Sequence, residues 1–154
     1  MTRKPIPFPL RIPFVETLDL ELWAFGDGHA ELQVELDEAH LNSWRVAHGG
    51  LVMTMLDVAM AHAARSVTVK AGDDHPGPGM ATIEMKTSFL RAAEGRLKAE
   101  GRLIHRTTTL AFCEGRLFDE AGELCAHATG TFKYLRALPT KGRHAKPLQT
   151  TSQP

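Results

Sequence analysis

The sequence predicts an α+β domain in which a curved antiparallel sheet of about five to six strands wraps one long central helix. Two observations lead to this prediction. The 17 residues from Leu51 to Val67 contain neither Gly nor Pro and are rich in Leu, Met and Ala, which are strong helix formers. Five other stretches alternate between apolar and polar residues, the pattern of half-buried strands. One helix and several strands must share a single core, which favours a sheet folded around the helix.

Length and charge limit the class of protein. The chain has 154 residues, which suits one domain, and we expect that domain, with a proline-rich N-terminal arm, to cover residues 1–137. Residues 138–154 are polar and lack periodicity, so we expect a disordered tail. The formal net charge is zero, which gives no electrostatic footprint for nucleic acid. The apolar stretch is shorter than a membrane span of about 20 residues, and prolines interrupt the N-terminus too often for a signal peptide. We therefore expect a cytoplasmic protein.

The first third of the chain leads up to the helix. Residues 1–14 contain four prolines and predict an extended arm that lies over the body or over a neighbouring subunit. Residues 14–25 mix apolar and acidic positions and predict a short helix or an irregular strand. Residues 30–37 alternate strictly and predict a half-buried strand. Residues 38–47 form a loop or a short helical turn before the helix.

The second half of the chain predicts a run of strands. Residues 71–79 are rich in Gly, Pro and Asp and predict a loop. Four alternating runs follow, at residues 81–90, 96–104, 109–118 and 124–134. Turn signals separate the runs, so we expect a meander in chain order. A sheet with one covering helix leaves edge strands open, which favours a dimer through edge pairing or helix packing.

The chemistry concentrates on the helix. It opens with His48 and the pair Gly49-Gly50, and glycine lets another group approach the backbone closely. Free amides at a helix N-terminus also provide a partial positive charge. Asp57 lies in the middle of a stretch whose apolar residues fall on every face, so we expect this helix to be buried on all sides. Burying a lone carboxylate is costly unless it is paired or hydrated, which makes Asp57 a candidate catalytic group.

These residues form a spaced motif: Asn42, His48-Gly49-Gly50 and Asp57. The motif resembles the hotdog-fold acyl-CoA thioesterases, specifically the phenylacetate-pathway (PaaI-like) branch, and the stretch TIEMKTSFLRAAEGRL is similar to that branch's central strand and turn. The resemblance covers residues 14–134 and departs at Arg45, where the family often has Gly. It implies a hotdog fold, hydrolysis of an acyl-CoA thioester to free acid and CoA, and a homodimer that assembles to a homotetramer.

The resemblance also implies roles for individual residues. The Gly49 amide polarises the thioester carbonyl, Asn42 and His48 help to place it, and Asp57 of the partner subunit acts as general base on water or as a nucleophile. Helix geometry agrees, because eight residues separate Gly49 from Asp57, about 12 Å along one helix. Thr82 corresponds to a hydroxyl that holds the water in some relatives, although a β-branched residue equally suits a solvent-facing strand position. His48 equally suits a capping role without catalysis.

Coenzyme A is part of the implied substrate, so no separate cofactor is expected. Its phosphates need cations and backbone amides, and the candidates are Gly50, Arg91, Arg106 and Lys133. No metal is expected, because the histidines lack the i, i+4 spacing of helical zinc sites; those near the helix are His40, His48 and His62. We interpret His62 as a packed polar residue, the helix methionines Met53, Met55 and Met60 as core or pliable pocket residues, and Cys113 and Cys125 as buried thiols.

Two alternatives to a thioesterase remain at this point. A hotdog dehydratase acting on 3-hydroxyacyl thioesters needs a His and an acid at one substrate carbon, which the motif fits less well. A non-catalytic acyl-CoA binding module needs only the pocket. The sequence also leaves the acyl group open among aromatic, medium-chain and hydroxyl-bearing groups.

Overall fold

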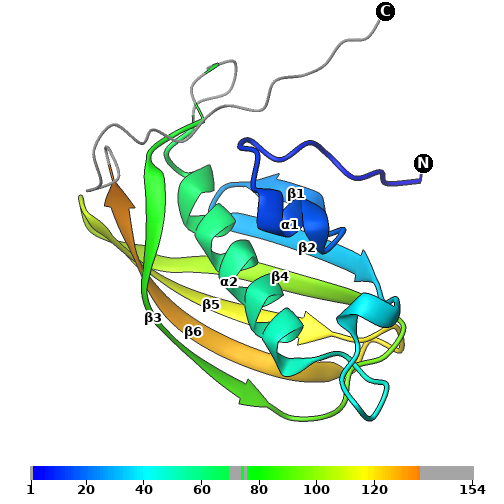
Figure 1. Ribbon diagram of the computed structural model, residues 1–154. Coiled ribbons are helices and arrows are strands. Elements are labelled where there is room, and N and C mark those ends of the chain that lie inside the picture. Colours follow the sequence, from blue (N-terminus) through cyan, green and yellow to red (C-terminus); the bar gives the residue numbers. More distant parts are fainter. Residues whose placement is uncertain (1, 70–73, 75, 136–154) are drawn as a thin grey trace, which may run out of the picture.

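The computed structural model describes residues 2–69, 74 and 76–135. The expected tail at 138–154 and part of the expected loop at 71–79 lie outside the described residues. The long helix α2 (Gly49–Ser66) lies across the concave face of a six-stranded sheet (Figure 1). The other elements are α1 (Pro13–Thr17), a 3-10 helix (Glu38–His40), β1 (Glu21–Gly26), β2 (His29–Glu35), β3 (Gly79–Phe89), β4 (Arg96–Arg106), β5 (Leu110–Phe118) and β6 (Leu124–Leu135). The ambiguous residues 14–25 thus form both a short helix and a strand.

The strand order corrects one prediction. All pairings are antiparallel, and the order across the sheet is β1-β2-β4-β5-β6-β3. The meander is confirmed for β4, β5 and β6, but β3 does not pair with β4. It pairs with β6 at the far edge, because β4 has β2 on one side, from His29 opposite Arg102 to Glu35 opposite Arg96, and β5 on the other. Alternation reveals a strand but not its partner, which is why the sequence predicted chain order.

The burial of α2 corrects a second prediction. Most of its side chains are buried against the sheet, including Met55 and Met60. One stripe of the helix is nevertheless open or half-open in the single chain: Gly50, Met53, Thr54, Asp57 and Ala61. The helix is therefore not buried on all sides, and Met53 is not a core residue. The uniform apolarity of the sequence hid this stripe, because it has no polar face apart from Thr54 and Asp57 to mark it.

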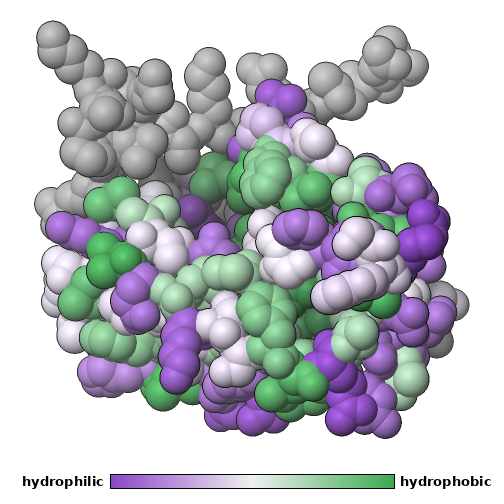
Figure 2. Space-filling view, turned by 60° about the horizontal axis from the view of Figure 1, so that its bottom comes forward, coloured by the Kyte–Doolittle hydropathy of each residue, from purple (hydrophilic) through white to green (hydrophobic). Residues whose placement is uncertain are grey.

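The two edges of the sheet differ in what lies beside them. The N-terminal arm covers β1, where Ile6 bridges to Leu22 and Arg3 donates to the Trp23 carbonyl oxygen over 2.9 Å. At the opposite edge, β3 pairs with β6 on one side and has no strand among the described residues on its other side. Side chains on or just after β3 are exposed: Ile83 at 56 %, Phe89 at 54 % and Leu90 at 57 %. Figure 2 shows apolar side chains scattered among hydrophilic ones across the lower side of the molecule. An edge strand with one open side and exposed apolar residues is suited to pairing with another chain.

The position of α2 depends on glycine in the sheet beneath it. A Cβ placed on Gly101 of β4 would lie 2.2 Å from the Ala59 carbonyl oxygen and 2.6 Å from the Met60 amide nitrogen. Gly115 of β5 lies directly opposite Gly101, and its Cβ would lie 3.0 Å from a Leu56 methyl carbon. The helix backbone can therefore sit directly on the sheet only because these positions lack side chains.

We expect Gly101→Ala to lower the free energy of unfolding by about 3 kcal/mol, because the new methyl group meets helix backbone that cannot move aside alone. Denaturant unfolding measures the change. Gly79→Ala is the matched control, since its Cβ would make ordinary contacts of 3.5 and 3.6 Å with Leu135, and its effect should stay within about 0.5 kcal/mol. Equal effects of the two substitutions would contradict the close approach at Gly101.

Candidate functional site

The start of α2 leaves one backbone donor available. His48 is the N-cap, and its Nδ1 accepts the Gly50 amide over 2.8 Å. Its carbonyl oxygen accepts the Leu51 and Val52 amides over 2.9 and 3.1 Å. Of the first four amides of the helix, that of Gly49 alone has no hydrogen-bond acceptor among the described residues. It is therefore the amide that can donate to a substrate oxygen.

This geometry assigns a structural role to two predicted residues. Because His48 Nδ1 accepts a hydrogen bond, the proton of the neutral ring is on Nε2. His48 therefore caps the helix, as one of its two sequence interpretations predicted. This capping role does not exclude a further role for Nε2. The Gly50 amide, which was a candidate for phosphate binding, is occupied by this cap. The Phe89 ring flanks Gly49, with its nearest carbon 3.5 Å from the position of a Gly49 Cβ.

The loop before α2 is organised by Asn42. Its Oδ1 accepts the backbone amides of Trp44 over 2.9 Å and Val46 over 3.3 Å. Arg45 between them has a φ of 63°, in the left-handed region that favours Gly. Glu38 holds Arg45 there through two bonds of 2.8 and 3.2 Å. The departure from the family's glycine thus keeps a glycine-like backbone, and placement of the thioester by Asn42 stays a prediction.

Asp57 and Thr82 meet in the open stripe of α2. The Thr82 hydroxyl donates to Asp57 Oδ1 over 2.7 Å. The pairing of β3 with β6 shifts register between Thr82 and Glu84, so Ile83 is the extra residue of a β-bulge. Bulges occur next to active sites because they re-aim side chains. The structure therefore brings together two of the predicted residues, and the Thr82 hydroxyl has a partner on the helix.

The surroundings of Asp57 alter its acidity. Partial burial raises the pKa of the Asp57 carboxyl, and the hydrogen bond from Thr82 acts in the opposite direction, lowering it. Burial is the larger effect. A carboxylate whose pKa is raised is a stronger base than an ordinary surface carboxylate, and such shifts are typical of functional groups.

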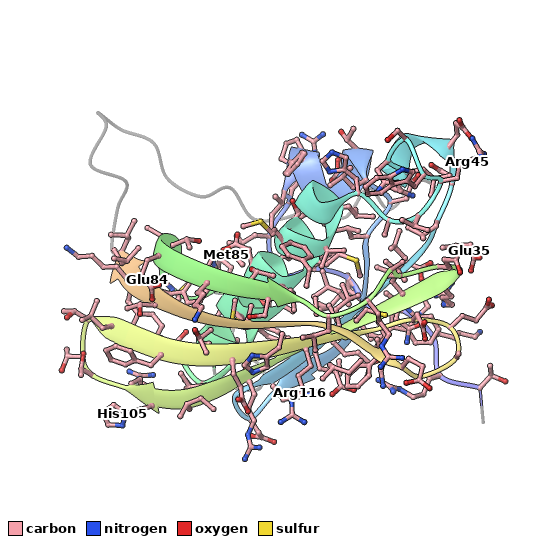
Figure 3. The ribbon with its side chains drawn as sticks, turned by 90° about the horizontal axis from the view of Figure 1, so that it is seen from below. Glu35, Arg45, Glu84, Met85, His105 and Arg116 are labelled. Atoms are coloured by element: carbon pink, nitrogen blue, oxygen red, sulfur yellow. The ribbon has the colours of Figure 1, made fainter. Side chains whose placement is uncertain are left out.

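A cavity of about 520 Å³ lies beside these two residues. We call it the α2 cavity. Helix α1 and the residue before it provide one wall with Ile12, Phe14 and Val15. Strand β3 provides another with Met80, Thr82 and Met85, and α2 contributes Met53 and Asp57. Figure 3 shows Met85 on β3. A mainly apolar cavity with few polar groups is typical of small-molecule sites.

Sequence reasoning missed part of this cavity. The α1 wall was hidden because residues 14–25 gave no clear period. His62 and Arg65, which also line the cavity, looked like ordinary helix residues. The predicted cations do not gather there: Arg91 pairs with Glu123 over 3.2 Å, Arg106 lies over the Tyr134 ring at 5.0 Å, and Lys133 is exposed on β6. None of these three lines the α2 cavity.

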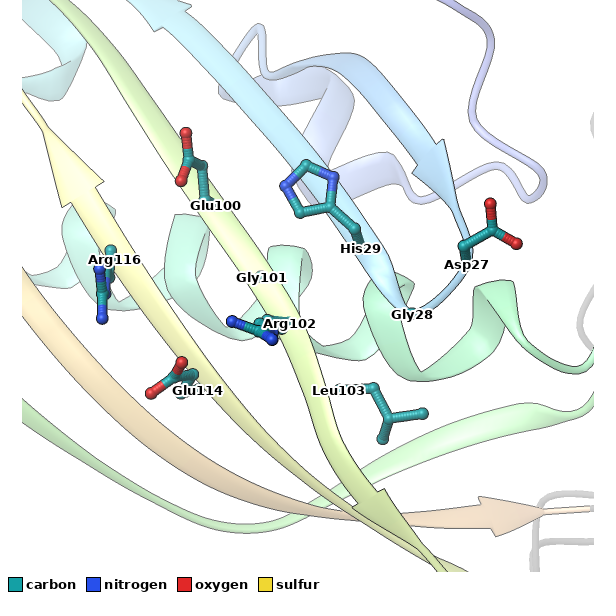
Figure 4. Close-up of a pocket in the computed structure, with 9 residues that line it drawn as sticks. All are labelled: Asp27, Gly28, His29, Glu100, Gly101, Arg102, Leu103, Glu114 and Arg116. Carbon is teal, nitrogen blue, oxygen red and sulfur yellow. The ribbon is translucent and has the colours of Figure 1, made fainter.

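A second cavity, of about 480 Å³, lies on the sheet face turned away from α2 (Figure 4). Arg116 and His105 project from that face in Figure 3. Its lining is dominated by charged side chains of both signs, including Glu100, Arg102 and Glu114. It contains none of the predicted site residues.

In residues 2–69, 74 and 76–135 no group of three or more His, Cys, Asp or Glu is placed to hold a metal ion, and no helix in those ranges is long and apolar enough to cross a membrane.

Comparisons with known proteins agree with this geometry. Residues 45–126 match the model of the Thioesterase superfamily. A protein of Archaeoglobus fulgidus, provisionally named an esterase, is 29 % identical over 118 residues, which cover 75 % of this chain and 71 % of that protein.

Solved structures are similar in fold. A conserved protein from Pseudomonas aeruginosa superimposes with a TM-score of 0.72 at 27 % identity, covering 82 % of this chain and 97 % of that one. A mutant of the phenylacetic acid degradation protein PaaI from Thermus thermophilus superimposes with a TM-score of 0.68 at 25 % identity, covering 80 % of this chain and 100 % of that one. The family match spans more than half of the chain and includes the start of α2, Asp57 and Thr82. The chain therefore belongs to the thioesterase superfamily, as a PaaI-like hotdog protein that hydrolyses thioesters.

Proposed function

We propose that the protein hydrolyses an acyl-CoA thioester, with Asp57 as general base and the Gly49 amide as the donor to the carbonyl oxygen. The observation that supports this most directly is the free Gly49 amide at the start of the helix that also bears Asp57. The family assignment favours hydrolysis over the dehydratase and the binding module. Coenzyme A enters and leaves with the substrate, so the reaction needs no resident cofactor.

The reaction uses two groups that are complementary to the transition state. Asp57 removes a proton from a water molecule as the oxygen of that water attacks the thioester carbon. The carbonyl oxygen becomes an oxyanion, which the Gly49 amide and the positive end of the helix stabilise. The tetrahedral intermediate then collapses, the carbon–sulfur bond breaks and CoA leaves as a thiolate. The hydrogen bond from Thr82 orients Asp57.

The two groups come from different subunits in this proposal. Along one helix, eight residues separate Gly49 from Asp57 by about 12 Å, too far for both to contact one carbonyl and its attacking water. A two-fold axis beside the open stripe of α2 brings each helix start to the partner's carboxylate. The open outer side of edge strand β3 and its exposed apolar residues, which flank that stripe, support this arrangement. Further pairing of dimers into a homotetramer is part of the same proposal.

We expect Gly49→Pro to reduce kcat by about 10²- to 10³-fold, the usual cost of one oxyanion donor. Proline removes the N–H yet fits the first position of a helix, and His48 before it already has the extended conformation (φ −62°, ψ 135°) that proline requires. Steady-state kinetics on an acyl-CoA with a thiol-trapping dye measure the effect. Gly49→Ala keeps the amide and makes only ordinary contact with Phe89, so it should retain most of the activity; equal losses would contradict the amide's role.

We expect Asp57→Asn to reduce kcat by about 10²- to 10⁴-fold, since the base is lost. Mixing unfolded Asp57→Asn and Gly49→Pro chains and refolding them together tests which subunits share a site. If the site spans two subunits, each mixed dimer has one intact site, and about a quarter of wild-type activity returns. If both groups act within one chain, every site keeps one lesion and no activity returns.

The pH dependence of kcat/KM should report the Asp57–Thr82 hydrogen bond. Activity needs the carboxylate, so it is lost as the pH falls through the Asp57 pKa, which burial raises. The Thr82 bond lowers that pKa, so Thr82→Val should raise it further and move the acidic limb of the profile to higher pH. Thr82→Ser keeps the hydroxyl and should leave the limb in place. An unmoved limb in Thr82→Val would show that another group titrates.

A further inference from the structure

Edge strand β3 carries a negative and a positive side chain that have no ionic partner in the single chain. Glu84 and Lys86 are exposed, and they lie opposite Thr131 and Thr129 of β6. The Thr131 hydroxyl donates to the Glu84 carboxylate over 2.8 Å. Among the described residues, the ion pairs all involve other side chains. Both charges are therefore available to a second chain that pairs with the open side of β3.

Met85 lies between the two charges and points to the other face of the sheet. Successive side chains of a strand alternate between the two faces. Met85 lines the α2 cavity together with Met53, so it lies on the helix side, whereas Glu84 and Lys86 lie on the side turned away from the helix. Figure 3 shows Glu84 and Met85 as neighbours on β3. Met53 is 37 % exposed and Met85 is half-buried, so a second chain can reach both methionines.

Two-fold symmetry restricts how two copies of β3 can pair. Residues directly opposite each other in an antiparallel pair have their side chains on the same face. When a two-fold axis normal to the sheet relates the two strands, this condition places one residue on the axis, opposite its own copy. The residue before it then faces the residue after it in the partner strand. Each possible register is therefore defined by the residue on the axis.

The charges on β3 distinguish between these registers. With Glu84 or Lys86 on the axis, that residue would face its own copy, and like charges directly opposite each other are destabilising. With Thr87 on the axis, neither charge would face an opposite one. With Met85 on the axis, Glu84 of each strand faces Lys86 of the other, which gives two ion pairs.

We propose that two subunits pair β3 with β3 in the antiparallel direction, with Met85 on the two-fold axis and each Glu84 paired with the partner's Lys86. This inference rests on the proposed function, because it specifies the dimer that the shared site requires. The β-bulge at Ile83 lies two residues before the axis, so Glu84, Met85 and Lys86 are the residues that pair regularly across it.

The helix selects the same axis by a separate argument. For the Gly49 amide of one subunit to meet the partner's Asp57, the axis must pass midway between these two positions on α2, which is at Met53. Met53 and Met85 line one cavity, so a single axis normal to the sheet can pass beside both. The register that pairs the charges therefore also brings each Gly49 amide towards the partner's carboxylate. Methionines are unbranched, so the side chains that meet at the axis adapt readily.

Disulfide cross-linking tests which residue lies on the axis. Directly opposite residues of an antiparallel pair have Cα atoms about 4.5–5.5 Å apart, a separation that a disulfide can bridge. We expect Met85→Cys to give a covalent dimer on a non-reducing gel after mild oxidation. Thr87→Cys is the matched control, because its two copies would lie about 13 Å apart along the strands and should not cross-link. The native Cys113 and Cys125 are buried, and the wild type measures their background.

Charge exchange tests the two ion pairs. Glu84→Lys alone and Lys86→Glu alone each place like charges opposite each other, so each should raise the dimer dissociation constant by about 5- to 50-fold. The double variant Glu84→Lys, Lys86→Glu restores opposite charges in reversed order, so its dissociation constant should return close to that of the wild type. Sedimentation equilibrium over a range of protein concentrations measures all four proteins.

Three results would overturn this register. They are cross-linking of Thr87→Cys without cross-linking of Met85→Cys, a double variant that dimerises no better than the single variants, and a wild type that stays monomeric at every concentration. Failure of the proposed function is a separate result, because it requires that the wild type hydrolyse no acyl-CoA.

Discussion

The direct contact between the backbone of α2 and the middle of the sheet is the constraint on which the structure depends. Strand β4 passes under Ala59 and Met60 at Gly101, where a single methyl group would overlap the helix backbone. Gly115 continues this path on β5. Because the helix is seated there, its N-terminus and Asp57 have fixed positions relative to β3. Close packing in the middle of the sheet thus positions the groups that the proposed reaction uses.

Two polar groups on α2 differ in their degree of burial and in how that burial affects their pKa. Asp57 is partly buried, which raises its pKa, and Thr82 limits that rise with one hydrogen bond. The balance of these two effects sets how readily the Asp57 carboxylate accepts a proton. His62 is buried more deeply and stays neutral with one nitrogen satisfied. Both side chains are more costly than apolar residues of similar size would be, and stability alone explains neither.

In the proposed mechanism, the single chain presents two halves of a site rather than one whole site. The free Gly49 amide and the Asp57 carboxylate project from one rigid helix, so no side-chain rotation brings them together. The same helix has an open stripe next to β3, an edge strand that among the described residues pairs on one side only. The N-terminal arm covers the other edge of the sheet, so the two edges differ in what they can bind. The proposed isologous contact at the open edge would pair the backbone of β3 and bring each Gly49 amide to the partner's carboxylate with one symmetry operation.

The sequence by itself determined the helix, the strands and the candidate residues of the proposed site. Local patterns decide these: helix-forming residues without Gly or Pro at 51–67, alternation in the strands, and a glycine pair before Asp57. Tertiary structure decided which strand lies beside which, that one stripe of α2 is open, and that His62 and Arg65 share a cavity with Asp57. The β-bulge at Ile83 and the contribution of α1 to the cavity wall could not be predicted from the sequence either. The physical reason is that periodicity records which side of an element is apolar, whereas pairing, exposure and cavities depend on contacts between segments far apart in the chain.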